Sequence, residues 1–90
     1  MIKEKQMSNL VNEVESKLCE IINRVGKSNY SNERLVECED LTGLGFDSVA
    51  LMTIVVECEE AFMFEFEEDE LVFSNINNFK TLRNIILEKK

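Results

Sequence analysis

The residues of this sequence best placed to do chemistry are Asp47 and Ser48, in the stretch "LTGLGFDSVALM". Both types are favoured helix caps, because a side-chain oxygen accepts a hydrogen bond from a free amide of the first turn, worth about 1 kcal/mol. A helix start also presents the positive end of the helix dipole, which tolerates an attached anion better than mid-helix does. Gly43 and Gly45 carry no side chain to obstruct a visiting protein. Ser48 is therefore either a cap or a hydroxyl that another protein modifies.

An enzyme that uses Ser48 as its own nucleophile is disfavoured, because the sequence contains no histidine. Histidine is the usual general base for such a nucleophile and the commonest zinc ligand. No lysine stands at S-x-x-K spacing from Ser48. The carboxylates of "EFEEDELVFSNI" lack the spacing and the glycine of a calcium loop. We therefore assign no catalytic residue and no metal ligand.

The composition describes one small acidic domain covering residues 1–90. Its 18 acidic and 10 basic residues give a formal charge of -8, which opposes binding to nucleic acid or to anionic lipid. No apolar run has the length of a membrane span, and the N-terminus lacks a signal-peptide segment. A monomer in the cytoplasm is expected, with its three well-separated cysteines reduced.

Two helices flank a long loop in the first two thirds of the sequence. Apolar residues at three-four spacing, the first of them Met7, predict a helix within residues 7–25. Ser8 or Asn9 could cap its start, and Gly26 could end it. Residues 27–45 lose this periodicity and predict a long loop, anchored through a short helical turn by three leucines. These are Leu35, Leu41 and Leu44. Helical spacing returns over residues 48–62.

The helix predicted over residues 48–62 has two apolar faces. The core-facing stripe contains Leu51, Ile54, Val55, Cys58 and Phe62. Val49, Met52 and Val56 point roughly 130° away from it and are bordered by Glu59 and Glu60. This second face is either a docking surface for partners with basic patches or is covered by the preceding loop.

The last third predicts an extended connector through Phe64 and Phe66, then one short helix near residues 68–73. Asn77 or Asn78 caps a final helix whose core positions are Phe79, Leu82, Ile85 and Ile86. The expected fold is all-α: a small antiparallel four-helix bundle with a long first loop and a short third helix.

Against this background, "LGFDSV" resembles the LG-x-DS-[LIV] attachment sequence of acyl and peptidyl carrier proteins. "ECEEAF" is similar to the acidic end of that family's second helix, and "INNFKTLRNII" to its fourth-helix region, so the resemblance spans nearly the whole chain. It implies that a phosphopantetheinyl transferase attaches the 4'-phosphopantetheine arm of coenzyme A to Ser48. Asp47 then caps the helix and contacts the transferase.

The same resemblance implies a discrete carrier of acyl or aminoacyl thioesters, visited by loading, condensing and modifying enzymes. Val49, Met52, Val56, Glu59 and Glu60 would form its recognition face. Thr53 and Met63 depart from the pattern of fatty-acid carriers, which favours a polyketide, nonribosomal peptide or related specialised pathway over a housekeeping fatty-acid carrier. An alternative of a different class is a noncatalytic acidic helical interaction module.

Overall fold

The computed structural model describes the backbone of residues 2–89 and the side chains of residues 10–89. Within that range the chain forms five α-helices and two 3₁₀ helices and no strand. In chain order they are α1 (Ile2–Gly26), α2 (Asn32–Glu37), η1 (Leu41–Leu44), α3 (Ser48–Phe62), η2 (Glu68–Glu70), α4 (Phe73–Ile76) and α5 (Phe79–Lys89). The all-α bundle expected from the sequence is confirmed, with one more short helix, α2, than the predicted four.

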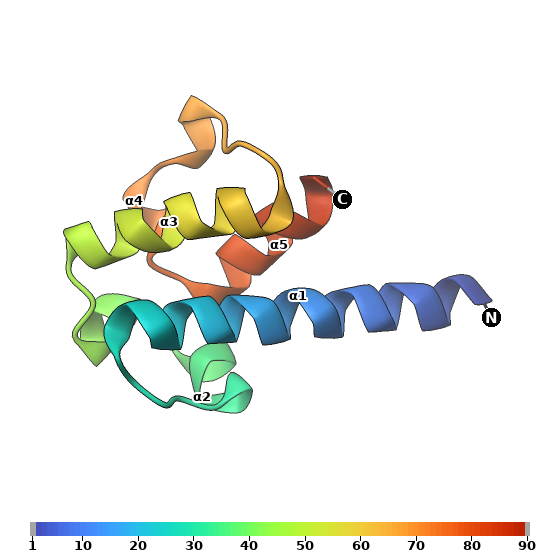
Figure 1. Cartoon of the computed structure of the whole chain (residues 1–90), viewed down its shortest axis with the longest axis horizontal. Helices are drawn as coiled ribbons and strands as arrows, with labels where there is room; N and C mark the ends of the chain where they lie inside the picture. The colour runs from blue at the N-terminus through green and yellow to red at the C-terminus, as the bar shows by residue number, and fades with distance from the viewer. Residues whose placement is uncertain (1, 90) are drawn as a thin grey trace.

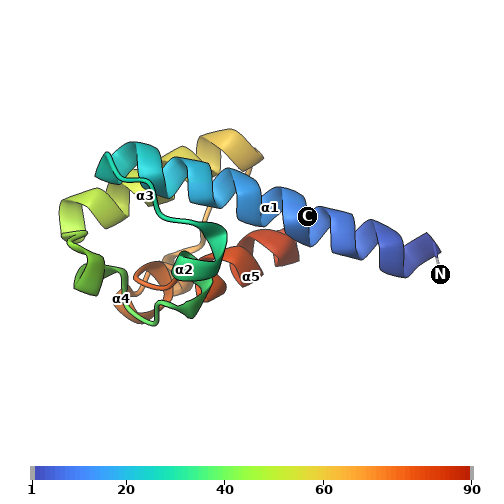
Figure 2. The ribbon, with the colours of Figure 1, turned by 90° about the horizontal axis from the view of Figure 1, so that it is seen from below.

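The bundle is arranged around the long helix α1 (Figures 1 and 2). It packs against α2, α3 and α5, and α3 and α5 run back against its direction (Figure 1). Four buried residues from each of α1, α3 and α5 meet between these helices. They are Val14, Leu18, Ile21, Ile22, Leu51, Ile54, Val55, Cys58, Phe79, Leu82, Ile85 and Ile86.

The start of α1 differs from the prediction. The helix begins at Ile2, so Ser8 and Asn9 lie inside it and not at its start. The stretch "IKEKQ", which precedes Ser8, consists mostly of residues with high helix propensity. The helix therefore continues through Ser8 toward the N-terminus. The predicted core position Met7 lies outside the described side chains.

The predicted long loop contains α2 and η1. Ser31 begins α2 by accepting a hydrogen bond from the Arg34 N–H at 3.2 Å. Leu35 and Leu41 are completely buried and Leu44 is partly buried, so the predicted anchoring of this connection by three leucines is confirmed. Within residues 2–89, no helix is both long and apolar enough to cross a membrane.

The single short helix predicted near residues 68–73 is instead two elements, η2 and α4, with a break between them. A capping box between Glu67 and Glu70 closes the single turn of η2. Val72 is extended, and α4 starts after it. The cap of α5 is Asn78 rather than Asn77: its Oδ1 accepts from the Thr81 N–H at 3.1 Å.

Candidate functional site

The turn that leads into α3 is shaped by Gly45 and Phe46. Gly45 ends η1 with φ of 99°, a left-handed conformation that favours glycine. The next residue, Phe46, is 4% exposed and belongs to the core cluster. Its ring lies so close to Gly26 that a Cβ at that position would be 2.6 Å from two ring carbons. Phe46 therefore packs into the core of the bundle.

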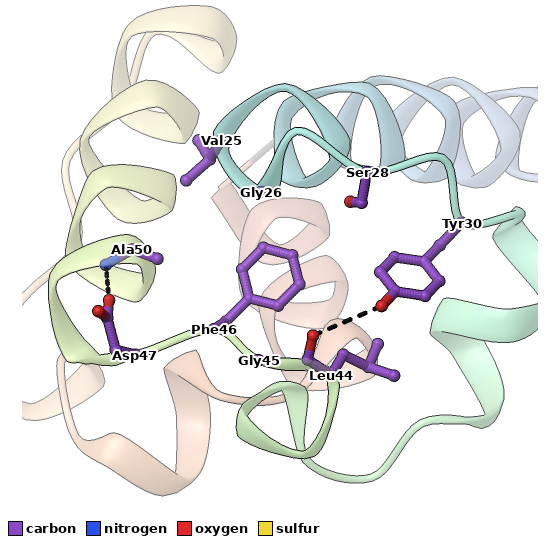
Figure 3. Close-up of a pocket in the computed structure, with 9 residues that line it drawn as sticks. All are labelled: Val25, Gly26, Ser28, Tyr30, Leu44, Gly45, Phe46, Asp47 and Ala50. Carbon is purple, nitrogen blue, oxygen red and sulfur yellow. Dashed lines mark hydrogen bonds between the residues drawn. The ribbon is translucent and has the colours of Figure 1, made fainter.

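A pocket of about 260 Å³ lies around this ring, between the end of α1 and the start of α3. Figure 3 shows the residues that line it. Asn23 organises the loop along its rim by three hydrogen bonds. Its Oδ1 accepts from the Tyr30 N–H at 2.8 Å and from the Ser28 hydroxyl at 2.9 Å, and its Nδ2 donates to the Tyr30 carbonyl at 2.8 Å. The role of Asn23 in holding this loop could not be predicted from the sequence, because its hydrogen-bond partners are set by the fold of the loop.

The start of α3 separates the two roles considered for Ser48. Asp47 is the N-cap: its Oδ1 accepts from the Ala50 N–H at 2.8 Å (Figure 3). Ser48 is the first helical residue and is exposed, and among the hydrogen bonds of the described residues none uses its hydroxyl. The interpretation of Ser48 as the cap is therefore wrong. Its hydroxyl remains open at the positive end of a 15-residue helix.

The outer face of α3 is exposed as the helical spacing predicted. Val49 is 73% exposed, Met52 45% and Val56 49%, so the alternative in which the preceding loop covers them is wrong. Together with Ser48 and Thr53, these side chains line one shallow, mostly apolar hollow. We call this the α3 hollow. Ser48 thus lies at one end of an apolar strip on the protein surface.

The acidic residues near the end of α3 have different environments. The Glu59 carboxylate accepts a hydrogen bond from the Phe66 N–H at 2.9 Å and so fixes the chain leaving the helix. Glu57 pairs with Arg24 of α1, and this contact raises the pKa of Arg24. Glu60 is exposed. Of the two predicted border residues, Glu59 therefore also has a structural contact.

The inward face of α3 offers no reactive thiol. Cys58 is completely buried, and its pKa is raised to about 12, first by burial and then by Glu57 and Glu59. It stays protonated at neutral pH and packs as a small apolar residue. Among the described residues, no group of three carboxylates or thiols is arranged to hold a metal ion.

Charge is distributed unequally along the sequence around this site. Residues 35–79, which include all of α3 and α4, hold twelve of the eighteen acidic residues and none of the ten basic ones. Every lysine and arginine therefore belongs to α1, α2 or α5, or is a residue next to α1 or α5. A partner that covers the start of α3 meets carboxylates and apolar side chains, a combination that favours basic partners with an apolar centre.

One comparison with known proteins gives a result. The sequence model of the family described as "Phosphopantetheine attachment site" matches residues 12–86. No curated protein and no solved structure matches the chain significantly. The matched range includes the end of α1, the whole turn before α3, and Ser48.

Proposed function

Because the chain belongs to the phosphopantetheine-attachment family of carrier proteins, whose prosthetic group is a covalent 4'-phosphopantetheine, we propose that Ser48 is the residue that bears this arm. Residues 1–90 then form one discrete carrier domain. It moves acyl or aminoacyl thioesters between enzymes of a polyketide, nonribosomal peptide or related specialised pathway. The arm supplies the thiol on which this cargo is held.

The observation that carries this proposal is the open hydroxyl of Ser48 at the first position of α3. The arm is joined through a phosphodiester, which is anionic. A helix N-terminus accommodates such a group through its free amides and its dipole. Asp47 already satisfies the Ala50 amide, so the helix start is in place before the arm is attached.

The chain contributes the nucleophile and the surface that the transferase recognises. The Ser48 oxygen bonds to the β-phosphorus of coenzyme A, the bond from that phosphorus to the 3',5'-ADP portion breaks, and the serine proton passes to a base. Because the chain has no histidine, we assign that base to the visiting transferase. Asp47 keeps Ser48 at the helix start and contacts the transferase.

Partner enzymes meet the carrier on the α3 face formed by Val49, Met52, Val56, Glu59 and Glu60. The exposure of the three apolar residues and the absence of basic residues from 35–79 support this assignment. Apolar contact supplies affinity, and the carboxylates steer basic docking patches toward Ser48. We expect the carrier to act in the cytoplasm as a monomer.

The test is intact-mass analysis after incubation with coenzyme A, magnesium and a broad-specificity transferase. Wild type is expected to gain one phosphopantetheine, and Ser48→Ala none. Because Asp47 holds the cap, Ser48→Ala should change the free energy of unfolding by less than about 0.5 kcal/mol. The matched control is Ser74→Ala, another exposed helical serine, which should be modified like wild type.

The competing function is a noncatalytic acidic interaction module, favoured by the exposed apolar strip alone. It predicts that wild type gains no mass and that Ser48→Ala leaves partner binding intact. If the Ser48→Ala variant were modified, the arm would have to be attached to a residue other than Ser48. A housekeeping role in fatty-acid synthesis would use the same arm. The acyl groups found on the carrier isolated from cells would distinguish that role from one in a specialised pathway.

A further inference from the structure

The inner and outer faces of α3 offer very different space to an apolar ligand. On the inner face Leu51, Ile54, Val55 and Cys58 are each at most 2% exposed and are packed in the common core. The outer face carries the α3 hollow, whose lining includes Ser48 itself. Of these two faces of α3, the outer one therefore offers open apolar space beside the attachment oxygen.

The dimensions and polarity of the α3 hollow suit an alkyl chain. From Ser48 to Val56 the helix advances eight residues, which is about 12 Å along its axis. Thr53 is the other polar residue in the lining. Its hydroxyl donates to the Val49 carbonyl at 2.9 Å, so it does not need water when the hollow is covered. The remaining lining residues, Val49, Met52 and Val56, are apolar.

Electrostatics favours a neutral occupant of the α3 hollow over an anionic one of the same size. No lysine or arginine lies between residues 35 and 79, so nothing within α3 or α4 pairs with a carboxylate or phosphate laid along this surface. A neutral alkyl chain meets no such penalty. A tethered chain is also present at an effective concentration in the millimolar range, which makes a weak surface contact significant.

We propose that, when no partner is docked, an alkyl acyl group carried on the arm folds back along the α3 hollow. This inference rests on the proposed attachment of the arm to Ser48. Cargo and partner then use the same side chains, Val49, Met52 and Val56, so an arriving enzyme displaces the cargo as it docks. Longer alkyl chains compete more strongly, and the length of the cargo regulates how readily partners bind.

Methionine methyl resonances can locate the cargo. The carrier is loaded by the transferase with acetyl or decanoyl pantetheine arms, and loading is verified by intact mass. Met52 lies in the hollow, whereas Met63 is 89% exposed beyond the end of α3. The decanoyl form should shift the Met52 methyl resonance relative to the acetyl form and leave that of Met63 unchanged.

A second readout is cleavage of the thioester by hydroxylamine. If millimolar effective concentration meets millimolar affinity, the chain is held about half the time, and cleavage of the decanoyl form slows about twofold. Met52→Gln should abolish this protection, and Met63→Gln should preserve it. Both substitutions place the same polar amide at an exposed position.

The possible results separate this inference from the proposed function. Failure to load wild type overturns both. Successful loading with no Met52 shift, or with equal cleavage of the acetyl and decanoyl forms, overturns the α3 hollow as the cargo site and leaves the carrier function intact. Shifts of the Leu51 and Ile54 methyl groups in place of Met52 would put the chain inside the bundle and overturn the inference as well.

Discussion

At the scale of single residues, Gly26 is required by its neighbour rather than by its own backbone. A Cβ there would lie 2.6 Å from the Phe46 ring, and that ring is buried directly before Asp47. Gly26→Ala should lower the free energy of unfolding by about 1 kcal/mol, because overpacking of about 1–3 kcal/mol exceeds the gain in helix propensity. Urea denaturation measures the change.

The control is Gly43→Ala, where an added Cβ meets nothing within 4 Å. Gly43 is not among the described residues with positive φ, so this variant should stay within about 0.5 kcal/mol of wild type. Equal effects of the two substitutions would show that the Phe46 ring moves aside without cost, and that Gly26 does not fix the turn before Ser48.

Met63 has a strained backbone conformation that its exposed side chain does little to offset. It ends α3 with φ of 57°, a conformation that costs a residue with a Cβ about 1 kcal/mol. Its side chain is 89% exposed, so little packing is lost when it is removed. Met63→Gly should raise the free energy of unfolding by about 0.5–1 kcal/mol.

The matched comparison for Met63 is Met52→Gly in the interior of the same helix, which should lower the free energy of unfolding by about 1 kcal/mol. Chemical denaturation of the two variants beside wild type gives both values. A loss of stability in Met63→Gly would mean that the methionine contributes contacts in solution that outweigh its backbone strain.

At the scale of elements, η2 is held by a charge contact that depends on pH. Glu70 accepts from the Glu67 N–H at 2.8 Å and pairs with Lys89 of α5 at 3.1 Å. The amide hydrogen bond, followed by Lys89, lowers the pKa of Glu70 below its ordinary value of 4.5. A carboxyl whose pKa is lowered by folding stabilises the folded state above the unfolded pKa and loses this effect as pH falls through the folded pKa.

Glu70→Gln should therefore be less stable than wild type at neutral pH, and the difference should shrink as pH falls below 4.5. Comparing the two proteins at each pH removes the repulsion among the other carboxylates, which both share. Urea unfolding across this range is the measurement, with Glu68→Gln, an exposed neighbour in η2, as control. A difference between wild type and Glu70→Gln that is constant with pH would contradict the role of the charge.

The elements that the sequence predicted well are those fixed by local contacts. The bounds of α3 were predicted as residues 48–62 because its cap, Asp47, and its helical spacing are both local. In contrast, η2 contacts Lys89, which is distant in the sequence, and the break between η2 and α4 was not predicted. The same holds at the site: Ser48 and the exposed α3 face follow from pattern, whereas the loop held by Asn23 follows from tertiary hydrogen bonds.

At the scale of the whole molecule, charge divides the protein into an acidic part and a basic part. Residues 35–79 carry twelve carboxylates and no basic residue. Ion pairs join this part to the rest through Arg24 and Glu57 and through Lys89 and Glu70. Salt weakens these pairs, but exposed pairs contribute little to stability. Screening of the repulsion among the carboxylates should therefore be the larger effect.

Salt should consequently act in opposite directions on stability and on recognition. Sodium chloride should raise the melting temperature by screening the repulsion among the carboxylates. It should also lower kcat/KM for modification by the transferase, because the attraction between the carrier and a basic docking patch is screened over the same Debye length of about 10 Å at 0.1 M.

Replacing Glu60 and Asp69 together by their amides should weaken both salt dependences, since both carboxylates are exposed in the acidic part. Glu13→Gln, on α1 outside that part, should affect the dependence of modification less. If kcat/KM were insensitive to salt while the melting temperature still rose, the acidic part would act only within the carrier, and apolar contact alone would bring the transferase to Ser48.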